Sequence, residues 1–320
     1  MTLIDLGAEW LDSEHAQSIS SSSLQIYSGV IEKHVMRWIG NARIEYVDAA
    51  FVKEWQRDLA RAGVTPDPRS RALKYLKMLL NFAVEQGYLQ GNPASVVKPP
   101  KIPASDPKKV LSPRQIESLI AELEIPRDRL LCRLMAYAGL RPIEARSLPW
   151  RSVQQRSLIV RSTKTNRVDT VRVWDFLIED LEAWRAESRP SKRDGPVFPS
   201  PSGGIGTRTD YNNWTRRVFS AAAVRAGHGE TTHRKTPRRT IPVHRATITP
   251  YTLRHSFASM LLRSGMQPVD VAARMRHNVE TTLKDYAHVI NDLDPMEPLT
   301  LPDAILQERE LVINGHVATV

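Results

Sequence analysis

A stretch rich in proline and lysine divides this chain of 320 residues and limits how it can fold. Within residues 92–109 stand Asn92-Pro93, Pro99-Pro100, Pro103 and Asp106-Pro107, interleaved with Lys98, Lys101, Lys108 and Lys109. Because proline interrupts helices and central strands, regular structure is expected to stop here and resume beyond it. The sequence therefore predicts a first domain at residues 1–104 that ends in this linker, a second domain at residues 105–290, and a C-terminal tail at residues 291–320.

The first domain is expected to be a bundle of about four helices. Apolar residues recur at helical spacing in three stretches, and a glycine that can end a helix follows each of them. These stretches are residues 24–38, 51–59 and 73–83, followed by Gly40, Gly63 and Gly87.

The second domain is expected to be rich in helices. Ser112, Pro113 and Gln115 supply an N-cap, a proline at the first helical position and a capping-box partner, which together indicate a helix start. A buried helix follows at Leu130–Met135, and Gly139 can terminate it. Further helical patterns cover residues 207–224, 252–263, 268–276 and 281–288.

Strand signals are confined to one part of the second domain. Residues 157–161 and 170–174 are β-prone and predict a hairpin with Lys164 near its tip. Residues 226–248, rich in Gly, Thr, Pro, Arg and His, predict a long basic loop. The expected fold class is therefore mainly α, with a helical bundle followed by an α-rich domain that holds a small antiparallel β-sheet.

The positive charge of the chain is concentrated. The formal net charge is +10, and residues 185–245 alone carry 13 Lys/Arg against 4 Asp/Glu. Such a concentration suits a polyanion, with nucleic acid first, although a solvated basic loop would have the same composition. The candidate DNA contacts, which could equally face water, are Arg71, Lys74 and Lys77 in the first domain and Arg234, Lys235, Arg238 and Arg239 in the basic loop.

Nothing in the sequence points to a membrane or to an oxidising compartment. No apolar run approaches the roughly 20 residues that span a bilayer, and the N-terminus has no signal-peptide pattern. The single cysteine, Cys132, allows no internal disulfide and is expected in the core. A cytoplasmic protein is therefore predicted.

Metal-dependent phosphoryl transfer would need clustered carboxylates, which the second domain does not offer. His228, His233 and His244 lack the spacing and companions of a zinc site. No glycine-rich phosphate loop is present, so ATP is not implied. We therefore expect no metal and no cofactor, and any phosphodiester chemistry would depend on side chains alone.

Several side chains that suit such chemistry stand in the second domain. Arg141 precedes Pro142, which keeps it out of helical conformation, so its guanidinium and the amides of the next helix could face one anion. Arginines in turns between helices are common, so this signal is weak alone. Arg254, His277 and Tyr286 follow at a spacing that short helices could bring into one pocket.

Five motifs in order give the second domain a resemblance to the tyrosine recombinases of the phage integrase family. They are Gly139-Leu-Arg141-x-x-Glu144, the hairpin lysine Lys164, Leu253-Arg254-His255, Met275-Arg-His277, and Thr281-Thr-x-x-x-Tyr286-Ala-His288. The helical first domain with its Pro/Lys linker also resembles the core-binding domain of that family. The resemblance implies a recombinase fold.

The resemblance also implies a role for each matching residue. Tyr286 would attack the scissile phosphate and form a 3′-phosphotyrosine, leaving a free 5′-hydroxyl. Arg141 and Arg254 would bind the non-bridging oxygens, a task that suits planar guanidinium groups. Lys164 would protonate the departing 5′-oxygen, and His277 would hydrogen-bond a phosphate oxygen.

Two positions depart from the family pattern. The milder departure is Arg276, because the family's Leu-Gly-His stands here as Met275-Arg276-His277. The family usually has histidine or lysine three residues before the second arginine, where this chain has Tyr251. A phenol can donate a hydrogen bond to phosphate but is a poor base, so the group that accepts the proton of Tyr286 is open. His255 would point about 100° away from Arg254 on a helix and is expected to pack or cap. Glu144 is expected to hold the Arg141 turn.

The resemblance therefore predicts a site-specific recombinase or integrase, with a compact, Xer-like architecture that lacks an arm-binding domain. It implies duplex DNA with short inverted core sites, a homotetramer in the synapse, a monomer or weak oligomer when free, and possible directionality or host factors. The tail would dock on a neighbouring protomer or pack on its own domain. Two alternatives stay open: a type IB topoisomerase-like enzyme, and a non-catalytic DNA-binding relative.

Overall fold

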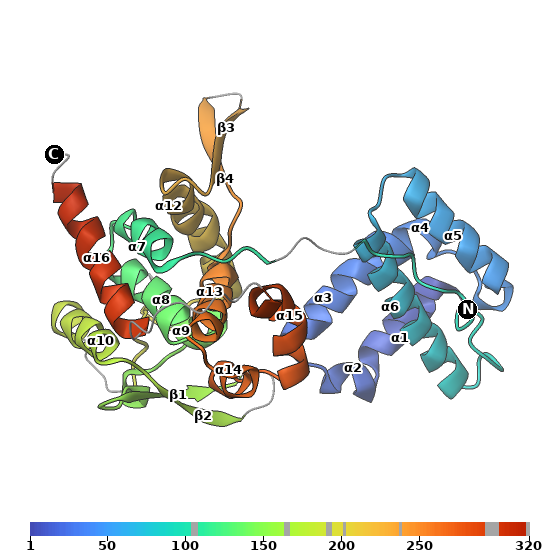
Figure 1. The fold of residues 1–320 in the computed structure, drawn as a ribbon. Coiled ribbons are helices and arrows are strands. Elements are labelled where there is room, and N and C mark those ends of the chain that lie inside the picture. The colour runs from blue at the N-terminus through green and yellow to red at the C-terminus, as the bar shows by residue number, and fades with distance from the viewer. Residues whose placement is uncertain are drawn as a thin grey trace. The chain divides into compact units, whose positions relative to one another are not determined.

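The computed structural model describes residues 1–103, 108–162, 167–189, 194–200, 203–236, 239–291 and 301–317, without the side chains of Ser22, 287–291 and 315–317. The chain divides into two compact units, Met1–Ser105 and Asp106–Val320, each with its own hydrophobic core. Helices dominate both units, as Figure 1 shows, and the predicted fold class is confirmed.

The described part of the first unit is built from helices, with one isolated β-bridge between Thr2 and Arg43. It contains α1 (Leu3–Asp12), α2 (Glu14–Ser18), α3 (Ser21–Ile31), a π-helical turn (Glu32–Met36), α4 (Arg37–Ile39), a 3₁₀ turn (Ile44–Tyr46), α5 (Ala49–Arg61) and α6 (Pro66–Glu85). A capping box between Thr2 and Asp5 begins α1, and Pro66 begins α6. Their apolar faces bury Trp10, Trp55 and Leu76 in one core.

The second unit carries two small sheets among its helices. Its elements are α7 (Pro113–Ala121), α8 (Pro126–Tyr137), α9 (Pro142–Arg146), a 3₁₀ turn (Trp150–Ser152), β1 (Ser157–Arg161), β2 (Val168–Arg172), α10 (Asp175–Ser188), α11 (Arg208–Trp214), a π-helical turn (Thr215–Phe219), α12 (Ser220–Arg225), β3 (Gly229–Lys235), β4 (Thr240–Ala246), α13 (Pro250–Arg263), α14 (Pro268–Met275), α15 (Val279–Asn291) and α16 (Leu301–Val317).

Helix α13 forms the centre of the second unit. It is buried along nearly its whole length and contacts α8, α14 and α15 (Figure 1). Thr249 and Thr252 form its capping box, and Pro250 occupies its first position. A helix buried on most of its circumference is covered by neighbours on several sides, so α13 fixes where these neighbours lie.

The first hairpin follows the prediction with a shift in its second strand. Strands β1 and β2 pair antiparallel from Ser157 opposite Arg172 to Arg161 opposite Val168, so β2 begins two residues before the predicted run. Lys164 lies between the two strands and outside the described residues.

The predicted basic loop at 226–248 is wrong, because this segment forms a second hairpin. Strands β3 and β4 pair from Gly229 opposite Ala246 to Lys235 opposite Thr240, and Figure 1 shows them standing out from α12. Most of their side chains are exposed on both faces, so the sequence lacks the apolar alternation of a half-buried strand. The β-branched residues Thr231, Thr232, Ile241 and Val243 are the signal that favoured strands.

Helix α16 packs on its own unit. Ile305 is fully buried in the core of the second unit, α16 contacts α7, and Arg309 donates to Asp180 of α10 at 2.7 Å. In this single chain the described part of the tail packs on its own domain, and docking of the tail on a neighbouring protomer stays a prediction. No helix among the described residues is both long enough and apolar enough to cross a membrane.

Candidate active site

The turn between α8 and α9 brings the first arginine of the site to α13 and α14. Gly139 adopts a left-handed φ of +62°, and a Cβ atom there would lie 2.6 Å from Phe257 of α13 and 2.9 Å from Met275 of α14. Glycine is therefore required both by the backbone conformation and by the close packing. Arg141 is the N-cap residue of α9, in agreement with the prediction that Pro142 keeps it out of helical conformation.

Arg254 is the buried centre of the site. Its side chain, on α13, is only 2 % exposed, and it donates hydrogen bonds to the carbonyl oxygens of Gly139 and Met275. Its Nη2 also lies 2.9 Å from Nε2 of His277. Burial and then the nearby guanidinium groups of Arg141 and Arg276 lower the pKa of Arg254 to about 9, so it is still charged at neutral pH.

Glu144 links the arginines to one another. Its carboxylate accepts the backbone N–H of Arg141 at 2.8 Å and the guanidinium of Arg141 at 2.7 Å, as expected for a residue that holds this turn. Its other contacts are Arg276 at 2.6 Å and Arg254 at 4.0 Å. Burial opposes ionisation, but Arg276 and the hydrogen bonds from Arg141 outweigh it, and the pKa of Glu144 lies below its ordinary value.

Arg276 is a member of this network for which the sequence predicted no role. It caps α14 with a left-handed φ of +54°, and its carbonyl oxygen accepts a hydrogen bond from Arg141 at 3.0 Å. Its guanidinium binds Glu144. Backbone and side chain of Arg276 thus both act on Arg141, one directly and the other through Glu144. A long side chain at a position that favours glycine was the available signal.

His277 lies directly after this cap. Because a guanidinium can only donate, Nε2 of His277 must accept the hydrogen bond from Arg254, which leaves its proton on Nδ1. That Nδ1 is buried and has no hydrogen-bond partner among the described residues. Burial and then Arg254 lower the pKa of His277 to about 4, so the ring is neutral at pH 7. His277 therefore offers one unused N–H donor.

Tyr286, on α15, is fully buried beside α13. Its hydroxyl lies 2.7 Å from Nδ1 of His255. His255, expected only to pack or cap, is therefore also in contact with the nucleophile. Burial raises the pKa of Tyr286 well above its ordinary value, and Arg254 opposes this shift.

The groups around His255 come from three segments. Lys108, before α7, forms an ion pair with Asp285 of α15, the residue next to Tyr286. Tyr251, one turn before His255 on α13, is 47 % exposed, and the two rings lie 6.5 Å apart. Burial and then Lys108 lower the pKa of His255 to about 4, so this ring too is neutral at pH 7.

The structure thus gathers Arg141, Arg254 and His277 into one hydrogen-bonded cluster with Glu144 and Arg276, and sets Tyr286 on the neighbouring helix. Tyr251 stands at the exposed start of α13, and its phosphate contact stays a prediction. Lys164 lies outside the described residues. Within the described ranges, no three His, Cys, Asp or Glu residues are placed to hold a metal ion.

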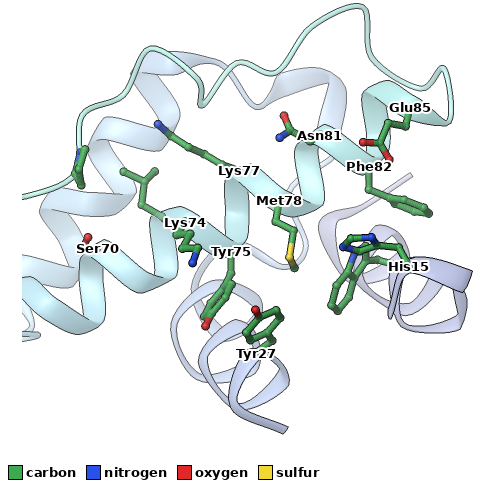
Figure 2. Close-up of a pocket in the computed structure, with 13 residues that line it drawn as sticks. His15, Tyr27, Ser70, Lys74, Tyr75, Lys77, Met78, Asn81, Phe82 and Glu85 are labelled. Carbon is green, nitrogen blue, oxygen red and sulfur yellow. The ribbon is translucent and has the colours of Figure 1, made fainter. Parts of the chain in front are cut away.

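The candidate DNA contacts of the first unit differ in their partners. Figure 2 shows Lys74 and Lys77 of α6 at the edge of a pocket of about 480 Å³, which Tyr27, Tyr75 and Phe82 also line. Lys77 donates to the carbonyl oxygens of Ser95 and Val97, at 3.1 and 2.8 Å, so its ammonium group already holds the segment before the linker.

Arg71 pairs with Asp67 at 2.9 Å on the exposed side of α6, and Lys74 is exposed. On the second hairpin, Arg234, Lys235 and Arg239 are also exposed. Arg238 lies outside the described residues. Contacts of these side chains with DNA stay predictions.

Comparison with known proteins identifies the family. The model of the phage integrase family matches residues 109–292, more than half of the chain. The chain belongs to this family. The resemblance inferred from the motifs is confirmed, and so is the class of enzyme, a tyrosine-type site-specific recombinase. The two alternative functions are not favoured.

Named relatives span most of the chain. Tyrosine recombinase XerD of Xanthomonas axonopodis pv. citri is 27 % identical over 283 residues, which cover 85 % of this chain and 88 % of the relative. Tyrosine recombinase XerD of Vibrio cholerae is 25 % identical over 289 residues, covering 86 % and 88 %.

Solved structures share the fold. The Tn1549 transposon integrase in complex with circular intermediate DNA aligns with a TM-score of 0.67 at 19 % identity, covering 96 % of this chain and 99 % of that one. A lambda integrase dimer bound to a COC′ core site aligns with a TM-score of 0.70 at 14 % identity, covering 94 % and 81 %. A lambda integrase tetramer bound to a Holliday junction aligns with a TM-score of 0.68 at 13 % identity, covering 89 % and 78 %.

Proposed function

We propose that this recombinase cuts and rejoins duplex DNA through a covalent bond between Tyr286 and a 3′-phosphate. The observation that carries this proposal is the buried guanidinium of Arg254, fixed beside His277 and linked through Glu144 to Arg141, with Tyr286 on the adjacent helix. A cluster of cationic donors is what a phosphodiester needs as its charge grows in the five-coordinate transition state. The tyrosine supplies the nucleophile.

Each side chain has a chemical task in this proposal. Arg141 and Arg254 bind the non-bridging oxygens, and the unused Nδ1–H of His277 donates to one of them. The phenolate of Tyr286 forms the new bond to phosphorus while the bond to the 5′-oxygen breaks. Lys164 gives its proton to that oxygen. The reverse steps rejoin the strand, and the phosphotyrosine ester conserves the bond energy so that no ATP is consumed.

The partners are proposed from the similarity of the fold to DNA-bound integrases and from the positive charge of the chain. Solved structures of the same fold include integrases bound to DNA, and one of them is a tetramer on a Holliday junction. We propose duplex DNA with short inverted core sites as the substrate, a homotetramer in the synapse, and the cytoplasm as the location. Arg234, Lys235 and Arg239 are exposed on the second hairpin, where they could bind phosphates. Phosphate contacts of this kind make affinity depend steeply on salt.

A nicked duplex tests the chemistry. Random-sequence duplexes that the wild-type protein retains are sequenced, and the recovered site is rebuilt with a nick next to the cleavage position, so that the short 5′-ended fragment diffuses away. Wild-type protein is expected to form a covalent adduct that survives denaturation. Tyr286→Phe should bind the duplex equally and form no adduct. Absence of an adduct with the wild type, or an adduct with Tyr286→Phe, would contradict the proposal.

A further inference from the structure

The hydroxyl of Tyr286 has a basic nitrogen in direct contact. Nδ1 of His255 lies 2.7 Å from the Tyr286 oxygen, and the two ring centroids are 5.9 Å apart. This is hydrogen-bond distance for a general base and the proton that it removes. Both side chains belong to helices that pack together, α13 and α15, so the contact depends on the core rather than on a surface loop.

The other candidates for this task are less suitable. Nε2 of His277 is occupied by the guanidinium of Arg254, and its Nδ1 carries a proton, so this ring has no free acceptor. Tyr251 occupies the position where the family has a histidine or lysine, but a phenol is a poor base at neutral pH. Glu144 accepts hydrogen bonds from Arg141 and Arg276.

We propose that His255 is the general base that takes the proton of Tyr286, a task for which the usual family residue is absent. This inference rests on the function proposed above and adds the proton acceptor to it. In the forward step the Tyr286 O–H bond breaks, its proton moves to Nδ1 of His255, and the phenolate oxygen bonds to phosphorus. In the reverse step the departing phenolate takes this proton back. The proton on the 5′-oxygen is exchanged separately with Lys164.

The surroundings of His255 keep its ring unprotonated until DNA binds. Its neighbours are Lys108 before α7, Arg254 and Tyr251 on α13, His277 after α14, and Asp285 and Tyr286 on α15. In the protein without DNA, burial and the cations Lys108 and Arg254 outweigh Asp285 and lower the pKa of His255 to about 4, so the ring is neutral at pH 7 but a weak base. A bound phosphodiester adds a negative charge, which favours the imidazolium. The proton therefore moves as the new O–P bond forms.

Two variants of His255, assayed on the nicked duplex described under the proposed function, test whether His255 is the general base. His255→Ala is expected to lower the single-turnover rate of adduct formation at pH 7 by about 10²- to 10⁴-fold, as is usual for a lost general base. Added imidazole should raise the rate of His255→Ala at least about tenfold, because it can occupy the vacated space and accept the proton. His255→Gln keeps a hydrogen-bond acceptor but no basic nitrogen, so its rate should stay low.

His228→Gln is the matched control. His228 is another half-buried histidine whose pKa is lowered by burial, but it lies before β3, where its backbone hydrogen bonds are to Ala223 and Thr247. Its substitution should leave the rate unchanged. If His255→Ala and His255→Gln cleave within about threefold of the wild type while Tyr286→Phe is inactive, His255 is not the base and the proposed function stands. If the wild type forms no adduct, both proposals fail.

A measurement without DNA covers the case in which the variants do not fold. In ¹⁵N-histidine NMR at pH 7, the wild-type protein should show His255 as neutral, with an unprotonated Nδ1 whose resonance shifts in Tyr286→Phe when the hydrogen bond is lost. A proton on Nδ1 at pH 7 would overturn the proposal, since His255 would then donate to Tyr286 rather than accept from it.

Discussion

The two halves of the site are held in different ways. Arg141, Glu144, Arg254 and Arg276 form an arginine half in which carboxylate and carbonyl oxygens bind each guanidinium group. The nucleophile half contains Tyr286 and His255, joined by one hydrogen bond, and the Lys108–Asp285 ion pair beside them. Stabilisation of a transition state needs donors that are fixed in advance. A nucleophile must instead approach phosphorus and leave it again, which a looser attachment permits.

Substitution of Arg254, a buried arginine of the arginine half, should lower the rate of adduct formation more than the other substitutions proposed below. In Arg254→Lys the charge is kept, but one ammonium group cannot reach Gly139, Met275 and His277 together. We expect a loss of about 10²- to 10³-fold in the rate of adduct formation on the nicked duplex. Arg263→Lys, at the exposed end of the same helix, is the control and should retain the wild-type rate. A similar rate in both variants would show that catalysis does not depend on the guanidinium contacts of Arg254.

Glu144→Gln tests the arginine half through stability. Removal of the buried carboxylate leaves guanidinium groups without their partner and should cost about 3 kcal/mol at pH 7. The folded-state pKa of Glu144 is depressed, so its contribution is full above the ordinary value of 4.5 and is lost as pH falls through the folded pKa. Urea unfolding across this range should therefore show the two proteins converge in acid.

Glu122→Gln gives the comparison for a carboxylate in a more exposed ion pair, with Arg225. It should change the free energy of unfolding by less than about 1 kcal/mol. A gap between wild type and Glu144→Gln that does not change with pH would mean that the charge of Glu144 is irrelevant to stability.

Arg276→Gly separates the conformation of the α14 cap from its charge. Glycine relieves a left-handed backbone, a gain of about 1 kcal/mol, and loses the bond to Glu144. Stability should therefore change little, while adduct formation falls about tenfold, equivalent to about 1.4 kcal/mol, because Arg141 loses an indirect support. Arg189→Gly relieves φ of +43° at an exposed site and should raise the melting temperature without affecting the rate. Equal rates of adduct formation in both variants would show that Arg276 does not support Arg141 in catalysis.

The ion pair of the nucleophile half should have the smallest effect. Asp285 raises and Lys108 lowers the pKa of His255, so Asp285→Asn should lower this pKa and Lys108→Met should raise it, each by less than about one unit. The pair is partly exposed, and adduct formation should change less than about threefold at pH 7. An NMR titration of His255 measures both shifts. Shifts of the same sign in the two variants would contradict the assigned contacts.

The sequence predicted the arginine half better than the nucleophile half. Arg141, Glu144 and Arg254 stand in local motifs whose turn and capping signals, Gly139 and Pro142, are explicit. The contact between His255 and Tyr286 depends instead on how α15 packs against α13, which helical spacing within α13 does not reveal. A helix buried on most of its circumference presents functional side chains in more than one direction. The angle of about 100° between Arg254 and His255 therefore did not exclude His255 from the active site.

The second hairpin and Arg276 escaped prediction for other reasons. Strands β3 and β4 bury almost no side chain, so hydrophobic alternation was absent and the turn-forming residues dominated the pattern. Arg276 occupies the position where the family motif has glycine, and its contact with Glu144 joins residues that are 132 positions apart. Local patterns carry no information about such a pairing.

Gly139 has a consequence for genetics. Its carbonyl oxygen accepts from Arg254 and, at 3.4 Å, from Arg276, while its missing side chain leaves room for Phe257 and Met275. A methyl group at this position would strain the left-handed turn and displace Phe257 and Met275, which would weaken the contact of Arg254 with the Gly139 carbonyl without altering any side chain of the site. Gly139→Ala is thus a candidate dominant-negative allele, a protein that still occupies its DNA and blocks recombination by the intact enzyme.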